Sequence, residues 1–136
     1  MKLATFRAPE HTEPLSGVVD GDQVSAFAGP HGVIDVLSGA AVPSESVGSW
    51  ALSEVELLAP VLEPGTVYAI GLNYAKHVEE TGNTAPERPI VFVKVRGSVA
   101  PPGGPIRCPQ VVRRLDYEGE LTIVIGAGGR IGGYCV

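Results

Sequence analysis

Glycine and proline interrupt this chain so often that only short strands and helices fit between them. The sequence holds 18 glycines and 12 prolines, together 30 of its 136 residues. Both residue types mark turns, because glycine accepts backbone conformations closed to other residues and proline lacks a backbone donor. The runs between them, such as residues 66–71 and 121–125, are rich in β-branched and apolar residues. This pattern predicts short strands joined by tight turns.

The first sixty residues predict a small N-terminal β region. Residues 3–7 are expected to form a strand, and residues 17–27 a hairpin that turns at Asp20-Gly21-Asp22. An Asp-Gly pair favours such a turn because it tolerates a positive φ. Residues 33–37 are apolar enough for another short element, whereas residues 40–53 receive no firm assignment.

Prolines and a glycine between residues 57 and 65 place a boundary near residue 60, so that residues 1–60 and 61–136 form two regions. In the second region, residues 66–71, 90–95 and 121–125 predict strands. A short helix is expected over residues 74–81, with Asn73 as its N-cap and Gly82 as its stop. Residues 134–136 are apolar and predict the start of a further strand.

The composition excludes several classes of partner. The formal net charge is −5, and the longest basic run is the pair Arg113-Arg114, which argues against nucleic acid and anionic membrane as partners. No apolar window approaches the roughly 18 residues of a membrane span, and the first seven residues lack the apolar run of a secretion signal. A cytoplasmic protein is therefore expected. Cys108 and Cys135 are then expected to be reduced, buried thiols.

The segment from Asp116 to Leu121 is the most informative for chemistry. Its acidic residues, Asp116, Glu118 and Glu120, recur with period two at the entry to an apolar strand. Alternate side chains share a face in extended geometry, and gathered carboxylates suit Mg²⁺, Mn²⁺ or Ca²⁺. An exposed strand edge that uses charge to prevent aggregation accounts for the spacing equally well. Spacing alone leaves both interpretations open.

A second segment with chemical potential lies on the predicted helix. His77 and Glu80 are three residues apart, a spacing at which a carboxylate can orient an imidazole for general-base chemistry on water. The alternative is a surface helix on which Lys76 and Glu80 form an ordinary pair four residues apart while His77 only packs.

Taken together and in order, these segments closely resemble the fumarylacetoacetate hydrolase family. The resemblance is carried by the four motifs at residues 67–82, 89–94, 102–106 and 116–121, and it is strong from about residue 57 to residue 126. The opening residues and the Asp-Gly hairpin look like the small N-terminal β region of many bacterial members. The resemblance implies a β-rich α+β fold, usually a homodimer, in which a divalent metal chelates a keto-acid or diketone substrate. Residues 61–136 would then be the N-terminal part of the catalytic domain.

The resemblance also implies roles for five residues. Glu118 and Glu120 match two glutamates of the family's metal triad, which would hold Mg²⁺ or Mn²⁺, with Ca²⁺ as an alternative. His77 and Glu80 match the His-x-x-Glu pair that polarises water in hydrolytic members. Lys94 matches a strand lysine beside the substrate. The family's third metal ligand, an aspartate beyond a Gly-Tyr-containing strand, has no counterpart in residues 1–136, and a short acidic helix before that strand is missing.

Three classes of function follow from this resemblance. The first is a metal-dependent hydrolase that cleaves a carbon–carbon bond in an acylpyruvate or 1,3-dicarbonyl acid, favoured by the His77 and Glu80 pair. The second is a catalytically silent or repurposed relative that serves as a scaffold or binds a small molecule. The third is one piece of an enzyme whose remainder lies on another polypeptide. Decarboxylase, isomerase and hydratase activities share the same fold, so the reaction type stays open.

Overall fold

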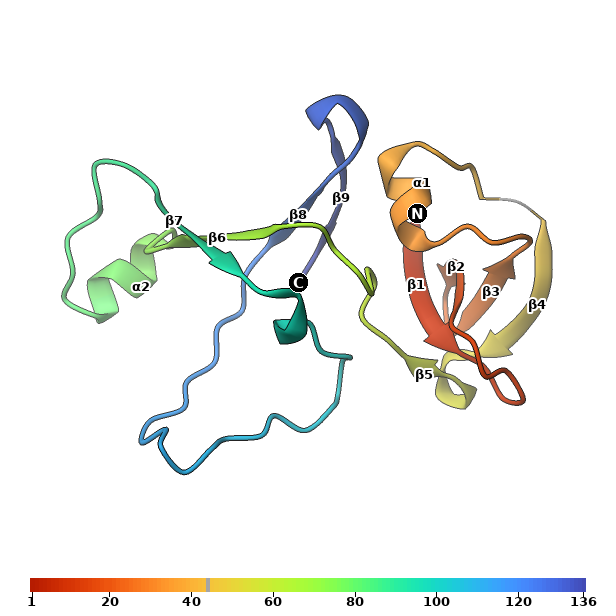
Figure 1. The fold of residues 1–136 in the computed structure, drawn as a ribbon, viewed down its shortest axis with the longest axis horizontal. Helices are drawn as coiled ribbons and strands as arrows, with labels where there is room; N and C mark the ends of the chain where they lie inside the picture. The colour runs from red at the N-terminus through yellow and green to blue at the C-terminus, as the bar shows by residue number, and fades with distance from the viewer. Residues whose placement is uncertain (44) are drawn as a thin grey trace. The chain divides into compact units, whose positions relative to one another are not determined.

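The computed structural model describes residues 1–43 and 45–136. The chain forms two compact units, the first made of residues 1–62 with 100–136 and the second of residues 63–99. Figure 1 shows the strand-rich character of the chain and its two short α-helices among the described residues.

A five-stranded antiparallel sheet forms the larger part of the first unit. Its strand order is β4-β3-β2-β1-β5. The strands are β1 (Lys2–Arg7), β2 (Leu15–Asp20), β3 (Gln23–Phe27), β4 (Ser46–Ala51) and β5 (Glu56–Leu57). The predicted strand over residues 3–7 and the predicted hairpin are confirmed. Asp20 pairs with Gln23, and Gly21 adopts a φ of 54°, as the Asp-Gly turn requires.

The core of this sheet is small and centres on Phe6 and Val24, which are both fully buried. The ring of Trp50 lies 5.9 Å from that of Phe6 at a tilt of 60°, and His11 meets the same indole edge-on. Thr5, also buried, donates its hydroxyl to the carbonyl oxygen of Pro60 at 2.8 Å. The chain beyond β5 is thereby held against β1.

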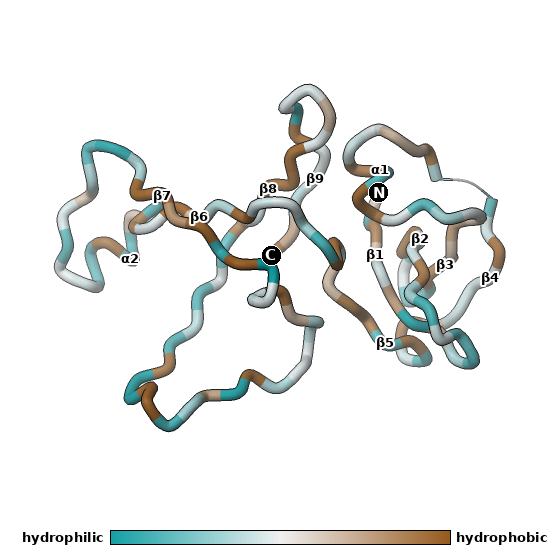
Figure 2. Tube along the Cα trace, in the orientation of Figure 1, coloured by the Kyte–Doolittle hydropathy of each residue, from teal (hydrophilic) through white to brown (hydrophobic). Residues whose placement is uncertain are grey.

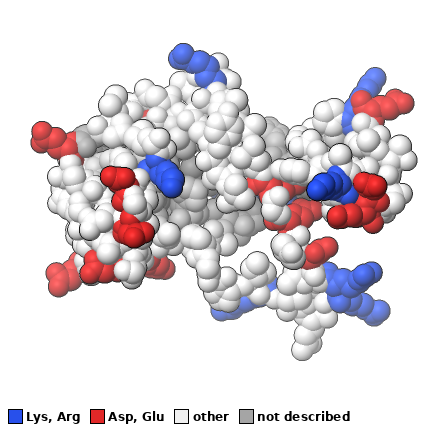
Figure 3. Space-filling view, turned by 180° about the vertical axis from the view of Figure 1, so that it is seen from behind, with Lys and Arg blue, Asp and Glu red and all other residues white. Residues whose placement is uncertain are grey.

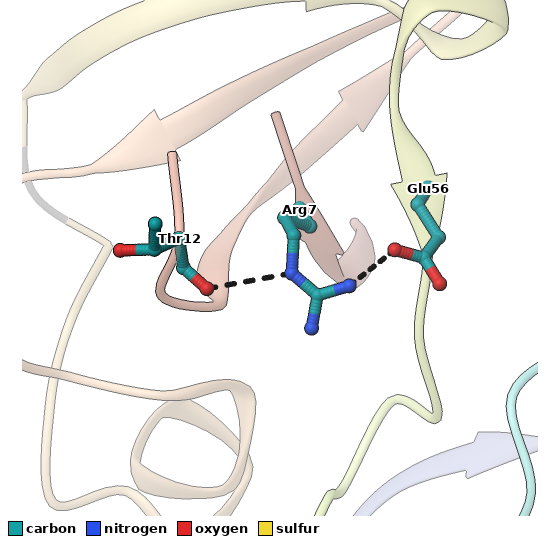
Figure 4. Close-up of polar contacts among 3 residues, drawn as sticks. All are labelled: Arg7, Thr12 and Glu56. Carbon is teal, nitrogen blue, oxygen red and sulfur yellow. Dashed lines mark hydrogen bonds and ion pairs between the residues drawn. The ribbon is translucent and has the colours of Figure 1, made fainter. Parts of the chain in front are cut away.

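An ion pair joins the edge strand β5 to β1. The guanidinium of Arg7 pairs with the carboxylate of Glu56, the residue opposite it in the register, and donates a second bond to the carbonyl oxygen of Thr12 at 3.4 Å (Figure 4). Both charged side chains are substantially exposed, so the pair contributes little to stability.

The first unit also contains helix α1 (Val33–Ser38), a 3₁₀ turn over Leu52–Glu54, and the antiparallel hairpin of β8 (Thr122–Ile125) and β9 (Ile131–Cys135). The helix ends at Gly39, whose φ is 80°. A 3₁₀ turn over Ala127–Gly129 joins the hairpin strands. The expectation that residues 134–136 begin a strand is wrong, because the short turn lets β9 start at Ile131 and end at Cys135.

The second unit contains the antiparallel pair β6 (Val67–Gly71) and β7 (Ile90–Lys94), helix α2 (Ala75–Glu80), and a 3₁₀ turn over Arg96–Ser98. The helix is shorter than predicted and its N-cap is Tyr74, not Asn73. Leu72 has a φ of 53°, and Tyr74 is still extended with a φ of −109° and a ψ of 118°, so the helix begins only at Ala75. Gly82, with a φ of 66°, follows the C-cap Thr81 and ends the helix as expected.

The strand pair of the second unit exposes apolar side chains. Tyr68 of β6 is exposed, and so are the first four residues of β7, Ile90 to Val93. Figure 2 shows β7 as a hydrophobic segment. Apolar residues at successive positions are typical of a strand that is covered on both faces. Within the described residues, all five positions of β7 are exposed.

The cysteines, the basic side chains and the helices can be compared with what the composition predicted. Cys108 is exposed and Cys135 is half-buried, so the prediction of buried thiols is wrong; Cys108 lies in an exposed segment without regular secondary structure, after the Pro-rich turn at residues 101–105. On the face drawn in Figure 3, lysine and arginine side chains lie in several separate small groups. No helix within the described residues is long and apolar enough to cross a membrane.

Candidate functional site

Helix α2 presents His77 and Glu80 to solvent. Val78 is the buried residue of the helix and anchors it, which leaves both candidate residues exposed. The hydroxyl of Thr81 donates to the carbonyl oxygen of His77 at 2.7 Å and secures the last turn. Among the described residues, no hydrogen bond or ion pair joins His77 to Glu80 or Lys76 to Glu80. The two candidate side chains are therefore accessible to a bound molecule.

Lys94 is the last residue of β7, in the same unit as His77. It lies opposite Val67 in the register of the strand pair. Its ammonium nitrogen is 5.0 Å from the centre of the Phe92 ring, two residues earlier on the same face. A cation above an aromatic face is attracted to it, so Phe92 restrains the direction of this exposed side chain.

The backbone conformation of Leu72 is a feature of this unit that the sequence did not indicate. Leu72 has a positive φ, a conformation that costs a non-glycine residue roughly 1–2 kcal/mol. It lines a hollow of about 210 Å³ together with Asn73 and the loop that carries Glu87 and Arg88. Leucine gives no local signal for this backbone conformation. Strain of this kind is typical of functional segments.

The acidic segment lies in the first unit, and its residues precede β8. Residues 114–121 have no regular secondary structure, Glu118 is exposed, and Glu120 is half-buried. The carboxylate of Asp116 accepts a hydrogen bond from the backbone nitrogen of Tyr117 at 2.9 Å. Both glutamates therefore come before the first paired residue of the strand, Thr122, instead of lying within it.

A divalent metal needs more ligands than this segment supplies. Within residues 1–43 and 45–136, no three His, Cys, Asp or Glu side chains are grouped so that they could hold a metal ion. Protein sites for Mg²⁺ and Mn²⁺ use several oxygen ligands at short distances. The residues described here do not by themselves fit a bound metal, and Glu118 and Glu120 could at most form part of its ligand set.

The fold and these residues define a class of protein, a strand-rich α+β domain of the fumarylacetoacetate hydrolase type. Residues 66–131 match the family described as "Fumarylacetoacetate (FAA) hydrolase C-terminal", and residues 1–60 match "Rv2993c-like, N-terminal". The chain belongs to the fumarylacetoacetate hydrolase family.

The chain is similar to proteins from bacteria and animals. Protein Rv2993c of Mycobacterium tuberculosis is 42% identical over 62% of this chain and 31% of its own length. The mitochondrial oxaloacetate tautomerase Fahd2a of Rattus norvegicus is 33% identical over 96% of this chain and 46% of its own length. A solved structure titled 5-carboxymethyl-2-hydroxymuconate delta-isomerase, from Mycobacterium smegmatis, superposes with a TM-score of 0.71 at 32% identity, covering 93% of this chain and 45% of that one. The chain spans less than half the length of these relatives.

Proposed function

We propose that this chain serves in an enzyme that interconverts the keto and enol forms of a small 2-oxo dicarboxylic acid. The similarity to an oxaloacetate tautomerase along 96% of the chain carries this proposal. An isomerase among the structural neighbours supports it, because both reactions move a proton next to a carbonyl group. Neither reaction needs water as a nucleophile.

The proposed chemistry assigns proton transfer to helix α2. The imidazole of His77 would take a proton from the carbon next to the 2-oxo group, and a proton would be placed on the carbonyl oxygen to give the enol. Glu80, one helical turn away, would orient the imidazole once substrate is bound. The ammonium of Lys94 would attract a substrate carboxylate. The exposure of all three side chains is consistent with these roles.

Glu118 and Glu120 stay proposed ligands of Mg²⁺ or Mn²⁺. A bound divalent cation would supply Lewis acidity at the 2-oxo group. Since the described residues offer no group of three ligands, further ligands would have to come from elsewhere. A homodimer and a cytoplasmic location are also part of this proposal, although five of the tautomerase relatives carry the word mitochondrial in their names.

Hydrolysis of an acylpyruvate is the second candidate. It is favoured by the His77-x-x-Glu80 spacing, which would let the same imidazole activate water. A silent or repurposed relative is the third candidate.

The experiment is a spectrophotometric assay of the enol form of oxaloacetate, with an acylpyruvate cleavage assay beside it. We expect the purified protein with Mn²⁺ to accelerate the enol-to-keto conversion, and His77→Ala to lose about 10²–10⁴-fold of the rate. The matched control is His31→Ala, which removes an exposed histidine of the first unit. Glu118→Gln should weaken Mn²⁺ binding, whereas His77→Ala should leave it nearly unchanged.

Each outcome separates the candidates. Equal turnover in His77→Ala would remove the proton-transfer assignment. Acylpyruvate cleavage without tautomerisation would favour the hydrolase, and inactivity in both assays would favour the silent relative. Unaltered Mn²⁺ affinity in Glu118→Gln would make the carboxylates merely an exposed edge.

A further inference from the structure

The glycine-rich run over residues 126–133 contains two kinds of glycine. Gly128 and Gly129 have positive φ values of 66° and 75° and open space around them, so they serve the turn between β8 and β9. Gly126, Gly132 and Gly133 do not have a positive φ, and turn geometry does not explain them. Their surroundings do, because all three lie against Leu37 of helix α1.

At Gly126 and Gly132 the backbone of Leu37 comes too close for any other residue type, whereas at Gly133 the neighbour is the movable end of the Leu37 side chain. A Cβ atom on Gly126 would lie 2.6 Å from the carbonyl oxygen of Leu37, and one on Gly132 would overlap the same oxygen and lie 2.9 Å from its carbonyl carbon. A Cβ atom on Gly133 would lie 2.7 Å from Cδ2 of the Leu37 side chain. Real Cβ atoms essentially never approach within 3.0 Å of another heavy atom. We call these three glycines and Leu37 the glycine joint.

The joint is the tight part of a loosely packed junction. Val33, one helical turn before Leu37, lines a cavity of about 520 Å³ together with Val124 of β8 and Tyr134 of β9. Helix and hairpin are thus separated by open space along part of their facing surfaces. A junction of this kind depends on the few atoms that do touch, here the last turn of α1 and the three glycines.

We propose that the glycine joint positions the segment carrying Glu118 and Glu120. That segment runs directly into β8, whose first paired residue, Thr122, follows Glu120 by two positions. When the hairpin is held against α1, the point where the acidic segment joins β8 is held in place relative to the five-stranded sheet. The N-terminal β region is then a positioning element for the site, and Leu37 is its positioning residue. The functional meaning of the two glutamates rests on the proposed function; the joint does not.

The first test is amide hydrogen exchange with resonance assignments on Gly132→Ala. Because the added methyl would meet backbone atoms, we expect the amides of β8 and β9 to exchange about tenfold faster and those of Glu118 and Glu120 to shift. The amides of β1 to β3 should keep their wild-type exchange. The matched control is Gly97→Ala, since Gly97 has open space and no positive φ. Wild-type exchange of the hairpin in Gly132→Ala, or the same change in Gly97→Ala, would overturn the proposal.

The second test stays decisive if Gly132→Ala fails to fold. Gly133 meets only the side chain of Leu37, so removing that side chain should relieve the added methyl group. We expect Leu37→Ala and Gly133→Ala each to increase the amide exchange rates of β8 and β9. In the double variant, the increase in these rates should be smaller than the product of the two single increases. Multiplicative effects would show that the two residues do not touch and would overturn the joint. Neither test measures turnover, so a failed joint and a failed proposed function are distinguishable.

Discussion

The core of the N-terminal sheet supplies the sharpest stability prediction, the loss caused by Phe6→Ala. Phe6 is fully buried, packs among Ala4, Val24 and Ala26, and meets the ring of Trp50. Truncating a buried phenylalanine costs about 3–5 kcal/mol, of which the lost aromatic pair accounts for about 0.5–1.5 kcal/mol. Few other buried residues could compensate, because among the described residues the next largest fully buried side chain is that of Val24, which is much smaller than a phenylalanine. We expect most of the stability of this sheet to disappear.

The assay is urea unfolding followed by tryptophan emission. Trp50 is the sole tryptophan of the sequence and contacts Phe6, so its emission reports on this sheet alone. The matched control is Phe92→Ala in the second unit, where the same side chain is 44% exposed and its loss should leave the urea midpoint reported by Trp50 unchanged. An unchanged midpoint in Phe6→Ala, or equal shifts in the two variants, would refute the assignment of Phe6 to the core.

Two further predictions concern the second unit. Leu72→Val should destabilise this unit by about 1–2 kcal/mol, because a β-branched residue tolerates a positive φ poorly, whereas Leu72→Asn should be nearly neutral. Thermal unfolding followed by circular dichroism compares the two variants. Equal losses of stability would contradict the strained backbone at Leu72. The apolar faces of β7 should drive self-association or the binding of a second polypeptide, which sedimentation velocity measures; a compact, well-behaved monomer would count against this expectation.

Local signals predicted the N-terminal region well. The Asp20-Gly21 turn and the alternation along β2 and β3 are encoded within a few residues, and the structure places that hairpin where the sequence predicted it. Strand β4 could not be predicted, because its Ser- and Gly-containing sequence carries little intrinsic strand preference. It is a strand because β3 offers it a partner, to which it pairs with a register shift between Ala26 and Phe27.

The candidate site shows the same division between local and distant information. Sequence spacing placed His77 and Glu80 on one short helix, as observed. Spacing also suggested that Asp116, Glu118 and Glu120 share one face of a strand, but the strand begins only after them. Period-two spacing says which residues would share a face if the segment were extended; it does not say whether a partner strand is there to extend it. The proximity of distant ligands cannot be deduced from spacing at all.

Glycine illustrates why composition underdetermines a structure. At Gly21, Gly128 and Gly129 the residue is needed for a positive φ, which neighbouring turn residues make visible in the sequence. At Gly132 it is needed because Leu37, far earlier in the chain, comes too close for a side chain. The residues next to Gly132 in the sequence give no signal of this contact. The run over residues 126–133 predicts only a turn, yet it also forms the surface that packs against Leu37. The same run therefore both closes the hairpin and attaches it to the N-terminal region, and this explains why glycines continue past the turn into β9.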